Sequence, residues 1–578
     1  MKSYIYLCLI LSIFASPLKL AATTVVISPE HDEYLCDYND RKKQAAKTML
    51  YYLNSLLWTK YAPHKWKKKH YGWNPDEQLE LSLNNLGALE ICSGDSFKPI
   101  FSRYVYSTQD VHTGVIYADE KIAFIPIRAE YIDNKLLVIA SGFSNIKTGD
   151  EIVSMDGDSP LDHLKKAFYG TTEVMETRPH FFLGQAFVRA GSRMPTPKNG
   201  SFLTLGLQQN GKLTFYKVQW NVTTTSALSS ASKNSHLAQF LQTEKKESRE
   251  EEEEEKFHLK NIAQVNLPVS FIKWSPVQLE ALEKLYHHET LPTTCGEADE
   301  TPANAPLDWG IYKQNGVDVG YIKIESFSNI DFDQVDRALQ SLEKRTQCLV
   351  IDTRGNPGGV DFSLFGLISR LTDKPLTNLM ISWILDEGII EKHRRLVPAL
   401  DSLLASVKSD ADFGGEEVSG MPVSIEFIRS LRSESMSCIE EWENGYTCTR
   451  FEPMRGLKTI QPHPKVRYTK PLYIMIDEKC ASCADMFPAI MRDNERATLL
   501  GRTTSGAGGT VESFPITNSF GVDHLFLTTS LLLRNSMKVI EDNGVSPDLE
   551  SKKTLSNVVN PNEEKAAAIL YAAKNYKK

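Results

Sequence analysis

Residues 347–359 read QCLVIDTRGNPGG, an apolar run that ends in a turn with two adjacent glycines. The run is short, apolar and bounded by turn residues, which is typical of a buried strand. Similar runs, VGYIKIESF, PLYIMIDEK, RATLLGRTT and HLFLTTSLLL, alternate with helical segments such as DFDQVDRALQSLEKRT. This alternation predicts an α/β domain over residues 306–555. Functional groups in such domains gather at strand ends.

The chain of 578 residues is long enough for several folded parts besides this domain. Residues 23–113 have the apolar spacing of helices and predict a helical N-terminal region. Residues 114–222 contain alternating runs and the phrase GDEIVSMDG, in which Asp156 and Gly157 form a hairpin turn. This phrase resembles PDZ domains, so we expect a PDZ-like β-rich domain there. Residues 556–578 predict a C-terminal helix.

Residues 223–305 differ in composition from the parts on either side. Six consecutive glutamates, Glu250–Glu255, repel one another and cannot contribute to a core. We therefore expect an acidic linker exposed to solvent. It is either a passive spacer or an activation segment whose cleavage regulates the protein, because exposed stretches are easily cut.

The N-terminus predicts export. Residues 1–22, MKSYIYLCLILSIFASPLKLAA, combine a lysine, a short apolar run and small residues at the end, as in a signal peptide. The run is shorter than the ~20 residues of a membrane helix, so we expect no stable membrane insertion, with an uncleaved anchor as the alternative. The net charge of −8, without a basic stripe, disfavours nucleic acid as a partner.

Cys480 and Cys483 have the CxxC spacing of some zinc and redox sites. No second CxxC and no HExxH motif completes a metal site, and the other cysteines are scattered along the chain. We expect no metal and no cofactor, with both thiols acting as small packing groups.

Three phrases in the α/β region carry residues suited to catalysis. The glycines of GNPGG allow close approach of the backbone to a substrate and direct N–H groups at a developing oxyanion, although such a phrase is most often only a turn. Ser482 follows an apolar strand and begins a helix, which exposes its hydroxyl at the positive helix end; a simple N-cap is the alternative. IEDNGVSPD supplies a carboxylate, Glu541, that could orient a histidine.

Together these phrases occur in the order found in the tail-specific, or C-terminal processing, serine peptidases, which the sequence resembles: a PDZ-like part, DTRGNPGG, the serine turn, the loop GRTTSGAGG at 501–509, and GVSPD. The segments KYAPHKWKKKHYGW, DVHTGV and SCADMFP resemble a secreted branch of this family, the protease-like activity factors of intracellular bacteria. The resemblance implies a crotonase/ClpP-like catalytic domain and a homodimer. It also implies a precursor activated by cleavage and host proteins or peptides as substrates, reached by secretion through the periplasm and into the host cytoplasm.

One departure from the family pattern bears on the mechanism. The family places a general-base lysine in the loop after the serine, where this chain has Ala507. Alanine accepts no proton, so a working serine needs another base, and histidine has a suitable pKa near neutral pH. The resemblance assigns this role to His112 and the role of the acid to Glu541.

The sequence therefore predicts a serine endopeptidase with a Ser482–His112–Glu541 triad. Backbone N–H groups would bind the oxyanion. The residues expected to provide them are Gly358, Gly359 and Cys483.

Alternatives remain at three points. Asp542 competes with Glu541 for the role of the acid, but neighbours on an extended strand face opposite sides, so only one of them would point inward. A catalytically inactive protein that binds peptides or other ligands could use the same fold. A peptidase with a serine–lysine dyad could use some other lysine.

Overall fold

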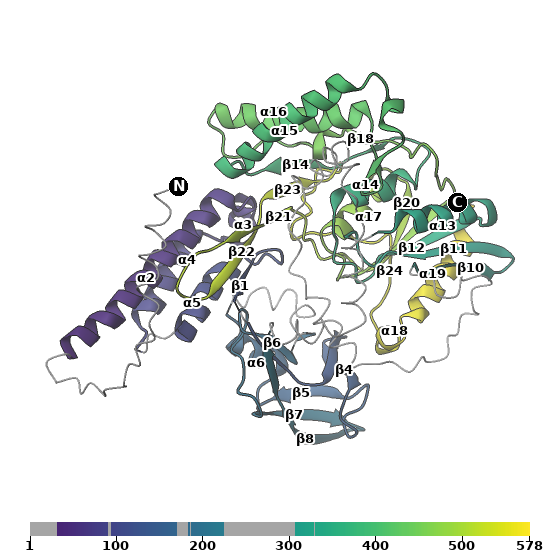
Figure 1. Ribbon diagram of the computed structural model, residues 1–578. Helices are drawn as coiled ribbons and strands as arrows, with labels where there is room; N and C mark the ends of the chain where they lie inside the picture. The colour runs from purple at the N-terminus through teal and green to yellow at the C-terminus, as the bar shows by residue number, and fades with distance from the viewer. Residues whose placement is uncertain are drawn as a thin grey trace, which may run out of the picture.

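The computed structural model describes residues 32–90, 94–118, 120–169, 183–184, 186–224, 307–328 and 330–577. The predicted signal peptide and the run Glu250–Glu255 lie outside these residues, as does nearly all of the predicted linker 223–305, so those interpretations stay predictions. In Figure 1 the purple N-terminal helices lie to one side, the blue β-rich domain lies below, and the α/β domain lies opposite the helices.

A sheet of six strands, in the order β10-β11-β12-β19-β20-β24, forms the centre of the α/β domain. The strands are β10 (Trp309–Gln314), β11 (Val317–Lys323), β12 (Cys348–Asp352), β19 (Leu472–Ile476), β20 (Ala497–Gly501) and β24 (Leu549–Glu550). β10 is antiparallel to β11, and the remaining pairs are parallel. Every residue of β12 and β19 is buried, as expected where both faces of a parallel sheet are covered. The predicted α/β domain is confirmed.

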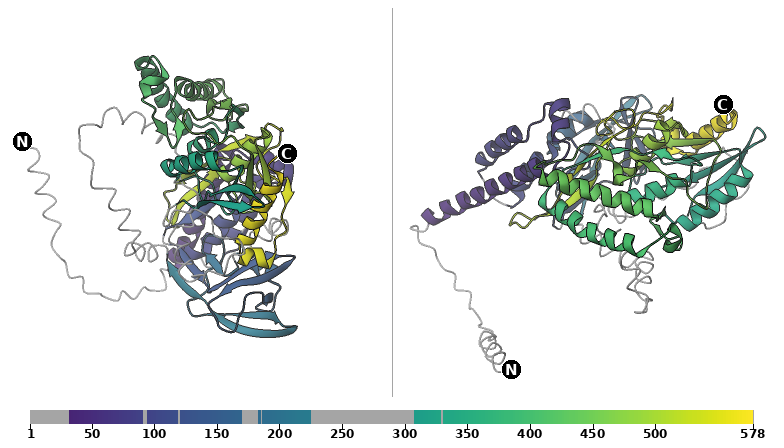
Figure 2. Two further views of the ribbon diagram at one scale, coloured as in Figure 1. Left: turned by 90° about the vertical axis from the view of Figure 1, so that its right-hand side faces the viewer. Right: turned by 90° about the horizontal axis from the view of Figure 1, so that it is seen from above.

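Helices cover both faces of this sheet. They are α13 (Phe332–Arg345), α14 (Asp361–Ser369), α17 (Cys483–Asp493) and α19 (Asn562–Asn575), with the short α18 (Leu555–Val559) before the last. Side chains of β12 alternate between the faces. Leu349 and Ile351 belong to the core that includes α13, α14 and α17, whereas Val350 lies in the core with Ile569 of α19. The yellow α19 runs along the sheet in Figure 2 (left), so the predicted C-terminal helix is present.

Smaller elements are inserted between β12 and β19 and after β20. The insertions are β13 (Leu376–Thr377), β14 (Met380–Trp383), α15 (Glu387–Ser406), η2 (Asp410–Phe413), β15 (Glu417–Val418), β16 (Met421–Pro422), α16 (Ile425–Glu443), β17 (Glu452–Pro453), η3 (Met454–Gly456), β18 (Thr459–Ile460), β21 (Val511–Pro515), β22 (Val522–Thr528) and β23 (Ser530–Leu533). Helices α15 and α16 pack side by side at the top of Figure 1. None of the helices in the described part of the chain combines the length and hydropathy needed to cross a bilayer.

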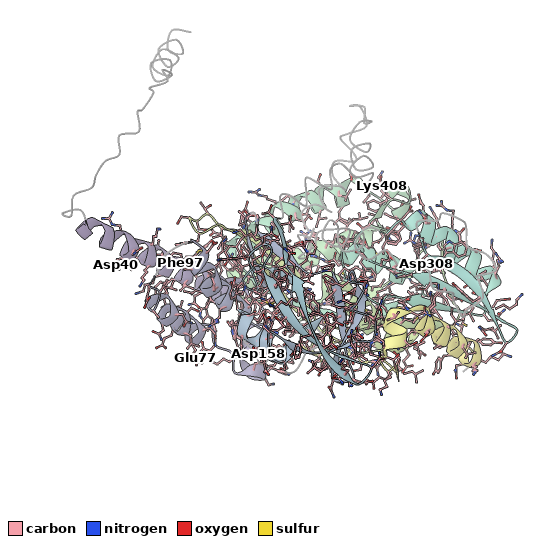
Figure 3. The ribbon with its side chains drawn as sticks, turned by 90° about the horizontal axis from the view of Figure 1, so that it is seen from below. Asp40, Glu77, Phe97, Asp158, Asp308 and Lys408 are labelled. Carbon is pink, nitrogen blue, oxygen red and sulfur yellow. The ribbon has the colours of Figure 1, made fainter. Side chains whose placement is uncertain are left out.

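The N-terminal region is helical, as predicted. It consists of α2 (Asp32–Lys60), α3 (His64–Tyr71), α4 (Pro75–Gly87) and α5 (Gly94–Tyr106). Phe97 and Phe101 of α5 each lie 5.2 Å, between ring centroids, from Phe520 in the turn between β21 and β22. Figure 3 shows Phe97 among these helices, with Asp308, just before β10, towards the other end of the molecule. The helices therefore share a core with a distant part of the chain.

The β-rich domain contains a sheet of five strands in the order β3-β4-β5-β7-β8 and a smaller sheet, β6-β2-β9. Its elements are β2 (Lys121–Phe124), β3 (Ile127–Ile132), β4 (Lys135–Ser141), β5 (Glu151–Met155), α6 (Pro160–Ala167), β6 (Val188–Ala190), β7 (Phe202–Gln209), β8 (Lys212–Gln219) and β9 (Asn221–Thr224). The predicted turn after β5 is confirmed, because Asp156 and Gly157 both have positive φ. The PDZ-like character of the domain stays a prediction.

The first strand, β1 (Gly114–Tyr117), departs from the predicted domain boundary. The sequence assigned residues 114–222 to the β-rich domain, but β1 pairs with β22 in a separate sheet, β1-β22-β21. Gly114 lies opposite Phe526 in this antiparallel pair. His112 lies two residues before the start of β1, so main-chain hydrogen bonds of the strand hold the adjacent backbone against the C-terminal half of the chain.

Truncation of Ile569 to alanine should reduce the free energy of unfolding by about 2–5 kcal/mol, because this buried side chain fills the interface between α19 and the sheet. Urea unfolding followed by circular dichroism measures the change. Lys574→Ala, at an exposed position of the same helix, is the control and should be close to neutral. Equal midpoints for both variants would contradict this account of the packing.

Candidate active site

Ser482 lies at a sharp turn between β19 and α17, where the sequence placed it. Its backbone has φ 56° and ψ −120°, a conformation that costs a non-glycine residue about 1–3 kcal/mol. Hydrogen bonds from its N–H to the carbonyl of Ala507 (2.9 Å) and to Asp485 Oδ2 (3.0 Å) hold this conformation. The turn therefore presents the serine at the positive end of α17, as required of a nucleophile that develops negative charge.

Asp485 connects the serine turn to the loop at 501–509. Its carboxylate accepts the N–H groups of Gly506 and Ala507, each at 3.0 Å, and the hydroxyl of Thr504, in addition to the N–H of Ser482. Burial raises the pKa of Asp485 to about 6, and the hydrogen bonds that it accepts oppose this shift. At neutral pH one carboxylate thus holds both backbone segments together.

The GNPGG turn packs directly against the serine. A Cβ atom at Gly358 would lie 2.7 Å from Ser482 Cβ, and Gly358 has φ 101°, so this position requires glycine. Asn356 Oδ1 accepts the N–H of Gly358 at 2.7 Å, and the carbonyl of Asn356 accepts the N–H of Ala481 at 3.1 Å. The turn is thereby joined to the residue before the nucleophile.

The N–H groups predicted to bind the oxyanion differ in whether they already have an acceptor. The N–H of Gly358 is already donated to Asn356, so it is not available to a substrate as the sequence predicted. The N–H groups of Gly359 and Cys483 are not donated to any other residue that the structure describes. Of the predicted residues, Gly359 and Cys483 therefore remain the candidates for binding an oxyanion.

His112 lies in the loop between α5 and β1 and is 5 % exposed. Asp110 shapes this loop, because its Oδ1 accepts the N–H of His112 at 2.8 Å and its Oδ2 accepts the hydroxyl of Thr528 at 2.7 Å. Burial lowers the pKa of His112, and Asp110 partly opposes this effect. The imidazole is therefore neutral at pH 7, which is the form that a general base needs.

Glu541 lies in the turn after Ile540, and it is buried. Its Oε1 contacts Lys67 Nζ of α3 at 2.8 Å, and its Oε2 accepts the N–H of Gly508 at 3.4 Å. Burial raises the pKa of Glu541 to about 8; the Asp110 carboxylate adds to this shift, and Lys67 opposes it.

The orientation of Asp542 differs from the one that the sequence predicted. The sequence predicted that Glu541 and Asp542 would face opposite sides of an extended strand. Asp542 instead has φ 63° within a turn, and both of its carboxylate oxygens lie 2.8 Å from Lys67 Nζ. Trp66 Nε1 donates to the same carboxylate at 3.0 Å. Both carboxylates therefore meet one ammonium group.

The three predicted catalytic residues are linked through a common residue or through adjacent residues of one loop. Ser482 contacts Ala507, and Glu541 contacts the next residue of the same loop, Gly508. His112 and Glu541 both interact electrostatically with Lys67.

Cys480 and Cys483 are buried, and their thiols donate to backbone carbonyl groups, at 2.9 Å for Thr353 and 3.2 Å for Gly359. Burial raises the pKa of both thiols. They act as packing groups around the serine turn, as predicted. Within the described ranges no cluster of three or more His, Cys, Asp or Glu side chains could hold a metal ion.

Comparison with known proteins finds a family that resembles this region of the chain. Residues 318–551 match peptidase family S41. These residues form a serine-type peptidase domain that is similar to this family. An uncharacterized protein of Chlamydia muridarum is 27% identical over 591 residues, covering 94% of this chain and 93% of that protein. A protein of Chlamydia pneumoniae is 26% identical over 556 residues, covering 88% and 87%.

Solved structures extend the likeness to nearly the whole fold of this chain. The structure of mature CPAF complexed with lactacystin has a TM-score of 0.73 at 22% identity and covers 92% of this chain and 99% of that one. A mutant of CPAF has a TM-score of 0.75 at 21% identity, covering 92% and 98%. The predicted likeness to the activity factors is thus confirmed in the fold.

Sequence reasoning missed several groups that shape the candidate site. Asp485 lies three residues after Ser482, the spacing of a capping box, and this spacing could have indicated it. Lys67 is one of several lysines in KWKKKH, where nothing local distinguishes it. Asn356 was visible only as part of a turn phrase.

Replacement of Asp485 by asparagine should lower kcat by about 10²-fold, because a misplaced serine turn loses the alignment with its oxyanion donors. A casein or fluorogenic-peptide assay measures the effect. Asp523→Asn removes a carboxylate from an exposed position of β22 and serves as the control. Full activity of the Asp485→Asn protein would show that the hydrogen bonds to the loop at 501–509 do not position the nucleophile.

Proposed function

We propose that this S41 peptidase is a secreted serine endopeptidase that uses a Ser482–His112–Glu541 triad and an acyl-enzyme intermediate. One observation carries the proposal: the strained turn places Ser482 next to Cys483 and against the glycine turn, and the N–H groups of Cys483 and Gly359 are donated to no other residue that the structure describes. Such donors stabilise a tetrahedral oxyanion by about 3–4 kcal/mol each.

In this mechanism His112 removes the proton from the Ser482 hydroxyl as the serine attacks the substrate carbonyl. The imidazolium then donates that proton to the leaving amine, and water releases the acyl group by the reverse sequence of transfers. Glu541, when ionised, orients the imidazole and stabilises its charged form. The depressed pKa of His112 supports its role as base.

A dyad of Ser482 with a lysine fits the site less well. The loop position of the usual lysine is Ala507, whose carbonyl accepts the N–H of Ser482. Lys67 is the buried lysine beside Glu541, but its carboxylate partners raise its pKa, so it stays protonated and cannot act as a base. These observations favour His112.

The biological setting is also part of the proposal. The predicted signal peptide supports export through the periplasm, and the resemblance to activity factors supports host proteins as substrates, reached in the host cytoplasm, and a homodimer. One of the similar structures is described as mature CPAF. By analogy this chain is made as a precursor and is activated by cleavage within residues 225–300, which include the acidic run.

Ser482→Ala or His112→Ala should lower kcat by about 10⁴–10⁶, and Glu541→Gln by up to about 10⁴, because each change removes one step of proton transfer or charge stabilisation. The same casein or peptide assay applies. Cys480→Ser, which alters a packing group beside the turn, should change kcat far less.

Labelling with a fluorophosphonate probe tests the alternative of an inactive binding protein. We expect covalent labelling of the mature wild type and none of Ser482→Ala. A mature protein that never labels would favour the binding protein, and an active His112→Ala variant would favour a lysine base.

Deletion of residues 225–300 should change the rate at which activity appears, because the proposed activation cuts lie within them. Gel electrophoresis and peptide hydrolysis over time compare the deletion with the full chain. Ser482→Ala shows whether the cuts are made by the enzyme itself. Unchanged maturation of the deletion variant would show that this segment takes no part in activation.

A further inference from the structure

Lys67 is a buried lysine on a helix whose other lysines face solvent. Lys65, Lys68 and Lys69 of α3 are exposed, whereas Lys67 has 0 % exposure. A buried ammonium group is unfavourable by several kcal/mol unless carboxylates compensate its charge. Compensation must therefore come from elements packed against α3.

The compensating groups come from a turn that is 475 positions away in the sequence. Lys67 Nζ lies 2.8 Å from Glu541 Oε1 and 2.8 Å from each carboxylate oxygen of Asp542. It also lies 3.4 Å from the carbonyl of Gln109, three residues before His112. One ammonium group thus contacts the turn that bears the acid and the loop that bears the base.

The charges around Glu541 come from every element packed on it. They are Lys67 of α3, Asp110 of the loop before β1, Asp542 of its own turn, and the hydroxyl of Tyr61 before α3. Two of these groups are carboxylates, and Lys67 is the cation among them. Without Lys67 this buried cluster would hold carboxylates with no fixed positive charge.

We propose that Lys67 is a positioning residue of the active site, whose ammonium group holds the Glu541 carboxyl group in place and favours its ionised form. This inference rests on the proposed triad and adds a residue to it. Burial, Asp110 and Asp542 all disfavour the ionised form of Glu541, and Lys67 opposes them. A protonated Glu541 could not stabilise the imidazolium, so Lys67 sets the pH range in which the triad works.

The pH dependence of kcat/KM tests this role in the full-length mature protein. Loss of an opposite charge at this distance raises the pKa of a carboxyl group by about 1–3 units. Loss of Lys67 also raises the pKa of His112, which Lys67 lowers. Lys67→Met should therefore move the acid limb of the profile by about 1–3 units to higher pH and lower kcat/KM at pH 7 by about 10- to 1000-fold. Activity should recover at alkaline pH.

Two further variants act as controls. Lys67→Arg keeps the charge and should restore the acid limb to near its wild-type position. Lys68→Met removes an exposed lysine from the same helix and should leave the profile unchanged. An equal loss of kcat/KM at every pH in Lys67→Met, or no loss at all, would overturn the proposal.

Lys67→Met leaves two buried carboxylates without a cation. A third variant therefore tests whether a change in activity comes from misfolding. The double variant Lys67→Met/Asp542→Asn removes one positive and one negative charge together. We expect it to fold with an unchanged circular dichroism spectrum and still show the shifted acid limb, since Glu541 has lost its contact. A wild-type profile in this folded protein would overturn the proposal.

The Glu541→Gln background separates this inference from the proposed triad. If Lys67 acts through Glu541, then adding Lys67→Met to Glu541→Gln should cost less than about threefold in kcat/KM, because the two effects are not additive. A full additional loss would mean that Lys67 acts elsewhere. Activity in Ser482→Ala or His112→Ala would instead overturn the triad itself, whatever the result for Lys67.

Discussion

The active site depends on a buried ion pair between the two ends of the chain. Lys67 of the N-terminal helices meets Glu541 and Asp542 of the α/β domain, and all three side chains are almost fully buried. Removing one partner of a buried pair costs about 3–5 kcal/mol, because the other charge is left without compensation. The N-terminal region is therefore part of the proposed catalytic unit.

Pairing of β1 with β22 supports this arrangement. The ion pair fixes α3, and the strand pair fixes the loop after α5, so His112 is held between two attachments to the C-terminal half of the chain. Thr528, at the end of β22, donates to Asp110 and ties the same loop a third time. The proposed base is held by contacts distant in sequence, so it is correctly placed only after both halves of the chain have folded together.

The nucleophile is positioned by local means instead. Ser482 has a strained backbone conformation, which the hydrogen bonds of Asp485 stabilise. The groups that take part lie within about twenty-five residues of one another in the sequence. Asn356 adds the glycine turn to this unit through Gly358. One part of the site is thus built from neighbouring strand ends of a single sheet, and the other part is added by docking.

Sequence alone determined what local patterns encode. The apolar runs and turns gave the α/β domain, the serine at a strand-to-helix turn, and the glycines that pack against it; Ala507 excluded the usual lysine base. Only the tertiary structure decided which lysine of KWKKKH is buried, that Asp542 turns toward the same ammonium group as Glu541, that Asn356 takes the N–H of Gly358, and that β1 joins β22. Each of these depends on groups far apart in the chain or on a single backbone angle. The period of hydrophobic residues carries no information about either of them.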